Sequence, residues 1–128
     1  MLRPALFVLV CLGLLASGAA CSGGSSPGPE PTPSDTLTIT ARALRFDAKR
    51  LVAVANAQVT VHMENRESGV PHNFAVYANR SAKDKIFVGE IFAGNDAKDF
   101  SFKTPAAGDY FFRCDVHPDT MTGTFAIR

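Results

Sequence analysis

A strand pattern and three metal-ligand side chains meet in one stretch, Gly108-Asp109-Tyr110-Phe111-Phe112-Arg113-Cys114-Asp115-Val116-His117-Pro118-Asp119-Thr120-Met121. Side chains alternate along an extended chain, so Tyr110, Phe112 and Cys114 are predicted to share one face of a strand. The thiol of Cys114 then emerges at the end of the core face. An imidazole and a thioether follow it in the next loop, at His117 and Met121. A thiolate, an imidazole and a thioether in one short loop are what a copper electron-transfer site requires.

A fourth candidate ligand, His72, lies far back in the sequence within Val70-Pro71-His72-Asn73-Phe74. A site assembled from two distant loops needs a rigid scaffold that brings them together. Pro118, directly after His117, stiffens the second loop and removes a backbone hydrogen-bond donor. We therefore expect a preformed cage, which keeps the rearrangement small when copper changes its oxidation state.

The rest of the chain after residue 35 reads as short strands. Apolar and polar residues alternate around residues 37–41, 59–64, 74–76, 99–103 and 124–128, with Gly-, Asn- and Pro-containing turns between them. Gly89, inside the apolar run 86–92, is predicted to mark a bulge or a close backbone approach. No window favours a long amphipathic helix. This pattern predicts an all-β fold, an antiparallel Greek-key β-sandwich.

Composition limits the chain to one domain and excludes several functions. The chain has 128 residues, 46% of them hydrophobic. Residues 36–128 contain twelve Lys and Arg against ten Asp and Glu, a net charge of +2. These charges are interspersed and form no basic stripe, so we expect no nucleic-acid binding. No second metal site or nucleophile–base constellation is signalled, so we expect no enzymatic activity.

The N-terminus has the layout of a secretory signal peptide over residues 1–20. Arg3 precedes an apolar run at 5–15, which is too short to span a bilayer, and small residues follow. Cys21 then has two readings: it is the lipid-modified first residue of a lipoprotein, or cleavage is ordinary and the thiol stays free. Gly18 departs from the lipoprotein pattern, but a free exposed thiol is a liability in an oxidising compartment, which favours lipidation. Either reading predicts export, to the outer face of the cytoplasmic membrane or the periplasm.

Residues 21–35 are predicted to form a Cys-anchored, disordered Gly/Ser/Pro linker, and residues 36–128 the folded domain. Cys11 leaves with the signal peptide, so Cys114 is the one cysteine of the domain and no disulfide can form within it. A lone cysteine in an exported domain suggests that its thiol has a chemical role. The alternative is an inert thiol buried in the core.

The domain resembles the cupredoxins, the blue copper fold of plastocyanin, azurin and amicyanin. The resemblance covers roughly residues 36–128 and rests on Asn65, His72-Asn73, the stretch 108–114, His117, Met121 and Gly123. It implies one copper ion held by His72, Cys114 and His117, with Met121 as a long axial ligand. It also implies that Asn73 ties the two ligand loops together near the cysteine sulfur.

Several side chains near this pattern have competing interpretations. Two residues separate Cys114 from His117 and three separate His117 from Met121, so Met121 is the least secure ligand and core packing is its alternative. Alternation places His62 on the solvent face and Met63 inside, so both are expected to be structural. Asp115 and Asp119 are hard ligands that do not suit a soft site, and we expect them to face solvent near the metal.

The leading hypothesis is a monomeric type 1 copper protein that carries single electrons between transient redox partners. The resemblance implies that electrons pass through the partly exposed edge of His117. A small docking patch beside it could comprise Val70, Pro71, Val116 and Pro118. The alternative is a copper delivery or storage protein that hands Cu(I) to another exported enzyme. Zinc fits less well, because structural zinc sites use Cys or His residues paired at close spacing. A binuclear copper centre needs a second cysteine, which the domain lacks. A domain that binds no metal and acts only in assembly would leave the complete ligand set unexplained.

Overall fold

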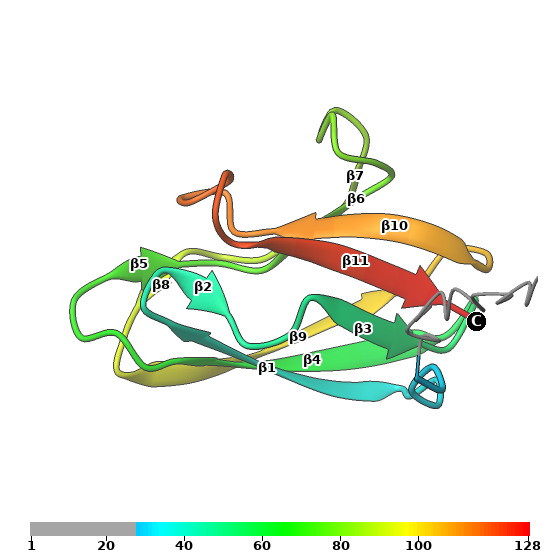
Figure 1. The fold of residues 1–128 in the computed structure, drawn as a ribbon, viewed down its shortest axis with the longest axis horizontal. Coiled ribbons are helices and arrows are strands. Elements are labelled where there is room, and N and C mark those ends of the chain that lie inside the picture. Colours follow the sequence, from blue (N-terminus) through cyan, green and yellow to red (C-terminus); the bar gives the residue numbers. More distant parts are fainter. Residues whose placement is uncertain (1–27) are drawn as a thin grey trace, which may run out of the picture.

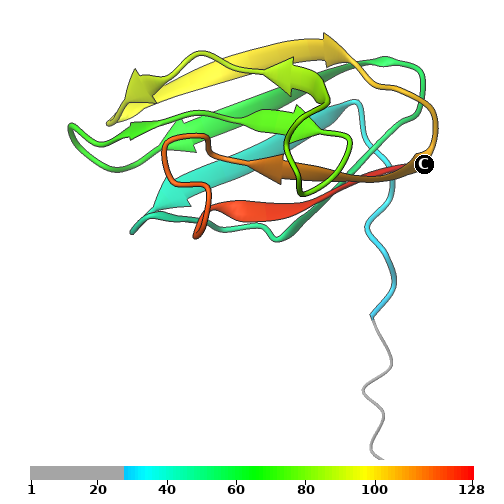
Figure 2. The same cartoon turned by 90° about the horizontal axis from the view of Figure 1, so that it is seen from above.

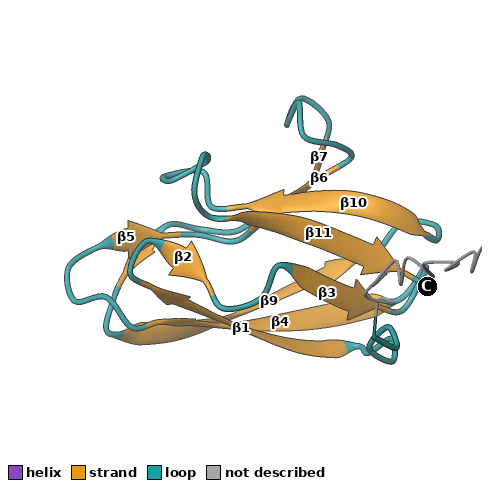
Figure 3. Ribbon diagram, viewed as in Figure 1, coloured by secondary structure: helices purple, strands orange, loops and turns teal. Residues whose placement is uncertain are grey.

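A computed structural model describes residues 28–128 of the chain (Figure 1). The predicted signal peptide, Cys21 and the first part of the predicted linker lie outside the described residues. Within residues 28–128 the secondary structure is β-strand throughout, joined by loops (Figure 3). This part of the chain contains no helix that is long and apolar enough to cross a membrane.

Eleven strands make up the described part of the chain. They are β1 (Thr36–Arg42), β2 (Arg45–Phe46), β3 (Arg50–Ala53), β4 (Gln58–Asn65), β5 (Pro71–His72), β6 (Ala75–Tyr77), β7 (Lys85–Val88), β8 (Phe92–Ala93), β9 (Asp96–Lys103), β10 (Gly108–Arg113) and β11 (Thr122–Ile127). One sheet has the order β2-β1-β4-β9, and the facing sheet has the order β3-β11-β10-β6-β7. The pair β5-β8 forms a third, small sheet at one end.

The predicted all-β sandwich is confirmed, and its sheets are mixed. Most neighbouring strands are antiparallel, but β1 pairs with β4 in parallel and β3 pairs with β11 in parallel. The chain leaves β1, crosses to the other sheet at β3 and returns at β4, so β1 and β4 run in the same direction. Strand alternation in the sequence cannot distinguish these two pairings, because it reports only which face is buried.

The core lies between the two sheets and is rich in phenylalanine. Val59, Val61 and Met63 of β4 are buried, while the residues between them reach the surface, as the alternation predicts. The rings of Phe74 and Phe112 lie 5.4 Å apart at the centre of this core. Burying each ring contributes about 1.5–3 kcal/mol. The ring packing fixes β10, which carries Cys114 at its end.

Gly89 marks a close backbone approach, as predicted. Its amide donates a hydrogen bond to the carbonyl of Phe74 at 2.9 Å. A Cβ on Gly89 would lie 2.9 Å from that same oxygen and 2.8 Å from the ring of Phe100. Only glycine fits here without displacing the chain that follows His72.

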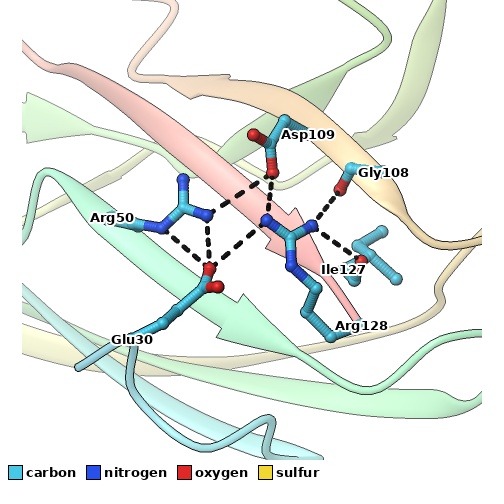
Figure 4. Close-up of polar contacts among 6 residues, drawn as sticks. All are labelled: Glu30, Arg50, Gly108, Asp109, Ile127 and Arg128. Carbon is cyan, nitrogen blue, oxygen red and sulfur yellow. Dashed lines mark hydrogen bonds and ion pairs between the residues drawn. The ribbon is translucent and has the colours of Figure 1, made fainter.

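The chain before β1 contacts the folded domain. The amide of Ser34 donates to the carbonyl of Val52 at 3.1 Å, and the amide of Val54 donates to the carbonyl of Ser34 at 3.2 Å. Further back, the carboxylate of Glu30 accepts hydrogen bonds from Arg50 and Arg128 (Figure 4). These contacts lie at the end of the sandwich where the chain terminates, opposite the β10–β11 loop (Figures 1 and 2).

Two carboxylates and two guanidinium groups alternate in the cluster of Glu30, Arg50, Asp109 and Arg128 (Figure 4). The hydrogen bond from Arg50 lowers the pKa of Glu30, and the one from Arg128 lowers the pKa of Asp109. A carboxyl whose pKa is depressed by folding stabilises the protein above its unfolded pKa, and this contribution disappears as the pH falls through the folded pKa.

We expect Asp109→Asn to lower the melting temperature at pH 7 and to have a much smaller effect in acid, where the native carboxyl is itself protonated. Thermal unfolding of the two proteins from pH 7 down to pH 3, at low and high salt, tests this. The difference should also shrink at high salt because these side chains are well exposed. An equal difference at every pH would contradict an electrostatic role for the cluster.

Candidate metal centre

The predicted ligands come together at the end of the sandwich away from the C-terminus. Cys114 directly follows β10, and His117 and Met121 lie in the β10–β11 loop. His72 ends the short strand β5, which pairs with β8. The two distant parts of the sequence meet because β6, which follows His72 after two residues, pairs with β10.

Three donor atoms converge on one point. The Sγ atom of Cys114 lies 3.7 Å from Nδ1 of His72 and 3.9 Å from Nδ1 of His117. The two Nδ1 atoms are 3.1 Å apart. Metal–nitrogen distances of about 2.0 Å and metal–sulfur distances of about 2.3 Å place donors around one ion roughly 3 to 4 Å from one another. These three residues also form the one metal-capable cluster of His, Cys, Asp and Glu found within residues 28–128.

The donor set is buried on one side and open on the other. The side chains of His72 and Cys114 are fully buried, and His117 is half-buried. Met121 is also fully buried, and its backbone closes the loop: its amide donates to the carbonyl of His117 at 3.1 Å, and its carbonyl accepts from the amide of Cys114 at 2.9 Å. A thiolate, two imidazoles and a neighbouring thioether fit a copper ion, because soft sulfur and imidazole ligands suit both of its common oxidation states.

Glu67 holds His72 in position, and the sequence analysis did not identify it. Its Oε2 atom lies 2.8 Å from Nε2 of His72 and accepts a hydrogen bond from the amide of Leu44 at 3.0 Å. Burial raises the pKa of Glu67, but the two hydrogen bonds together with the electrostatic effect of His72 and His117 leave the pKa lowered. A carboxylate at Nε2 fixes the ring and directs Nδ1 toward the other donors.

Asn73 joins the two ligand loops. Its Oδ1 atom accepts a hydrogen bond from the amide of Asp115 at 2.7 Å, and its Nδ2 atom donates to the carbonyl of Gly89 at 3.0 Å. Its own amide points at Sγ of Cys114, 3.5 Å away. An N–H directed at the sulfur helps to orient it as a ligand.

The prediction that Asp115 faces solvent is wrong. Its carboxylate accepts hydrogen bonds from the hydroxyl of Tyr77 at 2.8 Å, Nε of Arg113 at 2.7 Å and Nδ2 of Asn73 at 3.3 Å. Burial raises the pKa of Asp115, but the three donors prevail and lower it. That prediction rested on the carboxylate being too hard a ligand for a soft site, which does not show that β6 presents a tyrosine to it. Asp119 is exposed, as expected.

The exposed edge of His117 opens into a surface depression. Its lining comprises Leu44, Val116, His117, Pro118, Asp119 and Thr120. Leu44, which comes from the β1–β2 turn, is 42% exposed and was not in the predicted patch. Of the other predicted patch residues, Pro71 is exposed and Val70 is half-buried.

The two extra candidates from β4 stay away from the metal-ligand cluster, as expected. Nδ1 of His62 pairs with the carboxylate of Asp99 at 2.6 Å on the outer face of its sheet. Met63 is fully buried in the core. Both are structural.

Comparison with known proteins places this geometry in a family. The family model of the cupredoxin-like domain matches residues 5–127. No curated protein matches the chain. Among solved structures, the auracyanin of Roseiflexus castenholzii has a TM-score of 0.68 at 18% identity, covering 76% of this chain and 99% of that one.

Two further structures show the same fold. Auracyanin A of Chloroflexus aurantiacus, described as a blue copper protein, has a TM-score of 0.64 at 22% identity and covers 76% of this chain and 100% of that one. The amicyanin of Paracoccus versutus has a TM-score of 0.53 at 24% identity, covering 76% and 85% of the two chains. Since the family model spans nearly the whole chain and the fold agrees, the chain belongs to the cupredoxin-like domain family.

Proposed function

We propose that this protein is a mononuclear type 1 copper protein that carries single electrons outside the cytoplasmic membrane. The observation that supports this most strongly is the triangle formed by Sγ of Cys114 and the Nδ1 atoms of His72 and His117. Copper bound there supplies a one-electron couple between Cu(I) and Cu(II). The chain's own residues supply the rigid, partly buried setting in which that couple works.

Each ligand in this proposal is fixed by a neighbour. The amide of Asn73 faces the sulfur of Cys114, and the carboxylate of Glu67 fixes the ring of His72. The backbone bonds of Met121 close the loop around His117, and its thioether is the proposed axial ligand. Pro118 restricts the loop further. A site held this firmly undergoes little rearrangement when an electron arrives or leaves.

The half-buried ring of His117 is the proposed exit for electrons. It sits in the depression lined by Leu44, Val116 and Pro118, which gives a small apolar contact area. Small, weak contacts are typical of transient redox encounters. The likeness to auracyanin A, described as a blue copper protein, supports a copper site of this kind.

Export and anchoring complete the proposal. Residues 1–20 act as a signal peptide, and Cys21 is the lipid-attachment site that holds the protein, as a monomer, at the membrane surface. Residues 22–29 then serve as a spacer, because Glu30 and Ser34 already contact the domain. Mass spectrometry of the protein isolated from membranes tests this, since an unmodified Cys21 would contradict it.

The carrier function is tested by loading the protein with copper and cycling it between ascorbate and ferricyanide. We expect one copper per chain that survives repeated cycles in the presence of a copper chelator. A metal that binds but is lost to the chelator in the first reduced phase would instead identify a protein that delivers Cu(I).

We expect Glu67→Gln to raise the reduction potential. The amide keeps a hydrogen-bond acceptor at Nε2 of His72 but removes a negative charge that favours Cu(II) over Cu(I). Altering such a partner typically costs about 10- to 100-fold in metal affinity. For a one-electron couple, each tenfold loss of Cu(II) affinity relative to Cu(I) raises the potential by about 59 mV.

Potentiometric titration of the Glu67→Gln protein measures this shift directly. Glu64→Gln is a matched control, because Glu64 pairs with Arg66 on the surface and does not contact a candidate ligand. A potential unchanged by Glu67→Gln would show that the carboxylate does not act on the metal.

A further inference from the structure

The β6–β7 hairpin carries three exposed cations, Arg80, Lys83 and Lys85, and one carboxylate, Asp84. None of the three cations forms an ion pair within the described part of the chain. The net charge of this hairpin, +2, equals that of the whole folded domain over residues 36–128. The remaining charges of the domain therefore sum to zero. Residues 42–49 carry an equal net charge of +2, from Arg42, Arg45 and Lys49 against Asp47, so the hairpin is one of two positively charged segments.

The hairpin is held in a fixed shape. The amide of Ala78 donates to the carbonyl of Asp84 at 2.9 Å, and the amide of Ala82 donates to the carbonyl of Asn79 at 3.1 Å. The amide of Ser81 also donates to the side chain of Asn79 at 2.9 Å. A hairpin with these turn bonds presents its cations with little ordering cost on binding.

The hairpin packs against two aromatic side chains on the outer face of the five-stranded sheet. Phe111 and Tyr77 pack there with Ala82 of the hairpin against them. The guanidinium of Arg80 lies 5.2 Å from the ring centre of Phe111, and that of Arg113 lies 4.9 Å from the ring centre of Tyr77. Arginine over an aromatic ring keeps its charge available while its position is fixed.

This face lies beside the strand that leads to Cys114, because β6 pairs with β10 from Ala75 opposite Arg113 to Tyr77 opposite Phe111. In Figure 1 the β6–β7 hairpin and the β10–β11 loop both stand above the five-stranded sheet, the loop at the arrow end of β10 and the hairpin nearer the middle of that strand. Arg113 directly precedes Cys114 in the chain. The carboxylate of Asp115, on the same sheet, already accepts hydrogen bonds from Tyr77, Arg113 and Asn73. It therefore offsets Arg113 and leaves the hairpin charge unbalanced.

We propose that the β6–β7 hairpin, with Arg80, Lys83 and Lys85, is a docking surface for an acidic redox protein whose carboxylates surround its own electron-transfer centre. This inference rests on the proposed function, which requires a redox partner. Complementary charge steers such encounters and sets their orientation. A lipid surface holds no electron-transfer centre, so the proposed function makes a protein the occupant.

The test uses nuclear magnetic resonance of the metal-free protein with an oligo-glutamate peptide as an acidic probe. We expect amide shifts confined to residues 79–85 and Arg113. Lys83→Glu should weaken binding about fivefold at low salt, because an exposed charge pair contributes at most about 1 kcal/mol. Lys103→Glu is the matched control, since Lys103 is also exposed but lies on β9 of the other sheet, and it should change binding little.

Two results would overturn the proposal: shifts spread over all surface cations, or equal weakening by Lys83→Glu and Lys103→Glu. A third arm adds phosphatidylglycerol vesicles, and shifts of the hairpin with vesicles but not with the peptide would assign the surface to a membrane instead. Because these measurements need no copper, they stay informative if the protein proves not to be an electron carrier. With copper bound, oxidation by anionic ferricyanide should slow in Lys83→Glu, and the effect should fade at high salt.

Discussion

Replacing Cys114 with Ser is expected to abolish the intense visible absorption of the copper-loaded protein and to leave the fold intact. The band requires a copper–thiolate bond, and a serine hydroxyl is neither soft nor deprotonated at neutral pH. Cys114 is fully buried, and serine is close to it in size, so the strand and core around it should persist. Circular dichroism and the visible spectrum of the two proteins measure the two parts of this expectation.

Cys21→Ser provides the matched control for this change. Of the two cysteines predicted to remain after signal-peptide removal, only Cys114 lies among the described residues, where it is free and buried. We therefore expect the Cys21→Ser protein to keep the full band. Survival of the band in Cys114→Ser, or its loss in Cys21→Ser, would contradict the assignment of the thiolate.

Gly123→Ala is expected to cause a large loss of stability. Gly123 is buried near the start of β11, where a Cβ would overlap the ring of Phe112 and lie 2.6 Å from the carbonyl oxygen of Lys49. That oxygen accepts a hydrogen bond from the amide of Thr124, so it cannot move without loss. Overpacking a well-packed core costs about 1–3 kcal/mol and occasionally more. We expect urea unfolding to show that Gly123→Ala lowers the free energy of unfolding by about 3 kcal/mol.

Gly108→Ala is the corresponding control. At Gly108 the nearest atom to a new Cβ is a ring carbon of Tyr110 at 3.4 Å, which is ordinary van der Waals contact. This substitution should therefore change the free energy of unfolding little. Equal effects of the two substitutions would mean that the packing between Gly123 and Phe112 does not limit stability.

Local patterns in the sequence were sufficient to predict the sandwich and the clustering of the candidate ligands. Cys114 follows a strand whose alternation is clear, and His117 and Met121 come next in the same loop. These three residues are therefore close in space because they are close in sequence. His72 could be added because the resemblance supplied the pairing between two distant loops. The structure brings His72, Cys114 and His117 together as that resemblance implied.

The features that were missed depend on contacts between segments with no local signal. Glu67 reads as an ordinary turn residue, and only the fold shows that it reaches Nε2 of His72 and the amide of Leu44. Likewise, Asp115 faces Tyr77 only because β6 pairs with β10. The parallel pairing of β1 with β4 also depends on how the chain crosses between sheets, which alternation does not encode.

The most direct test of the central claim is the electron paramagnetic resonance and visible spectrum of the protein after addition of Cu(II), before and after ascorbate. We predict an intense visible band with narrow copper hyperfine splitting, bleached by ascorbate and restored by ferricyanide, from copper held by His72, Cys114 and His117. A weakly absorbing complex with wide hyperfine splitting would contradict the proposal that these residues form a type 1 site.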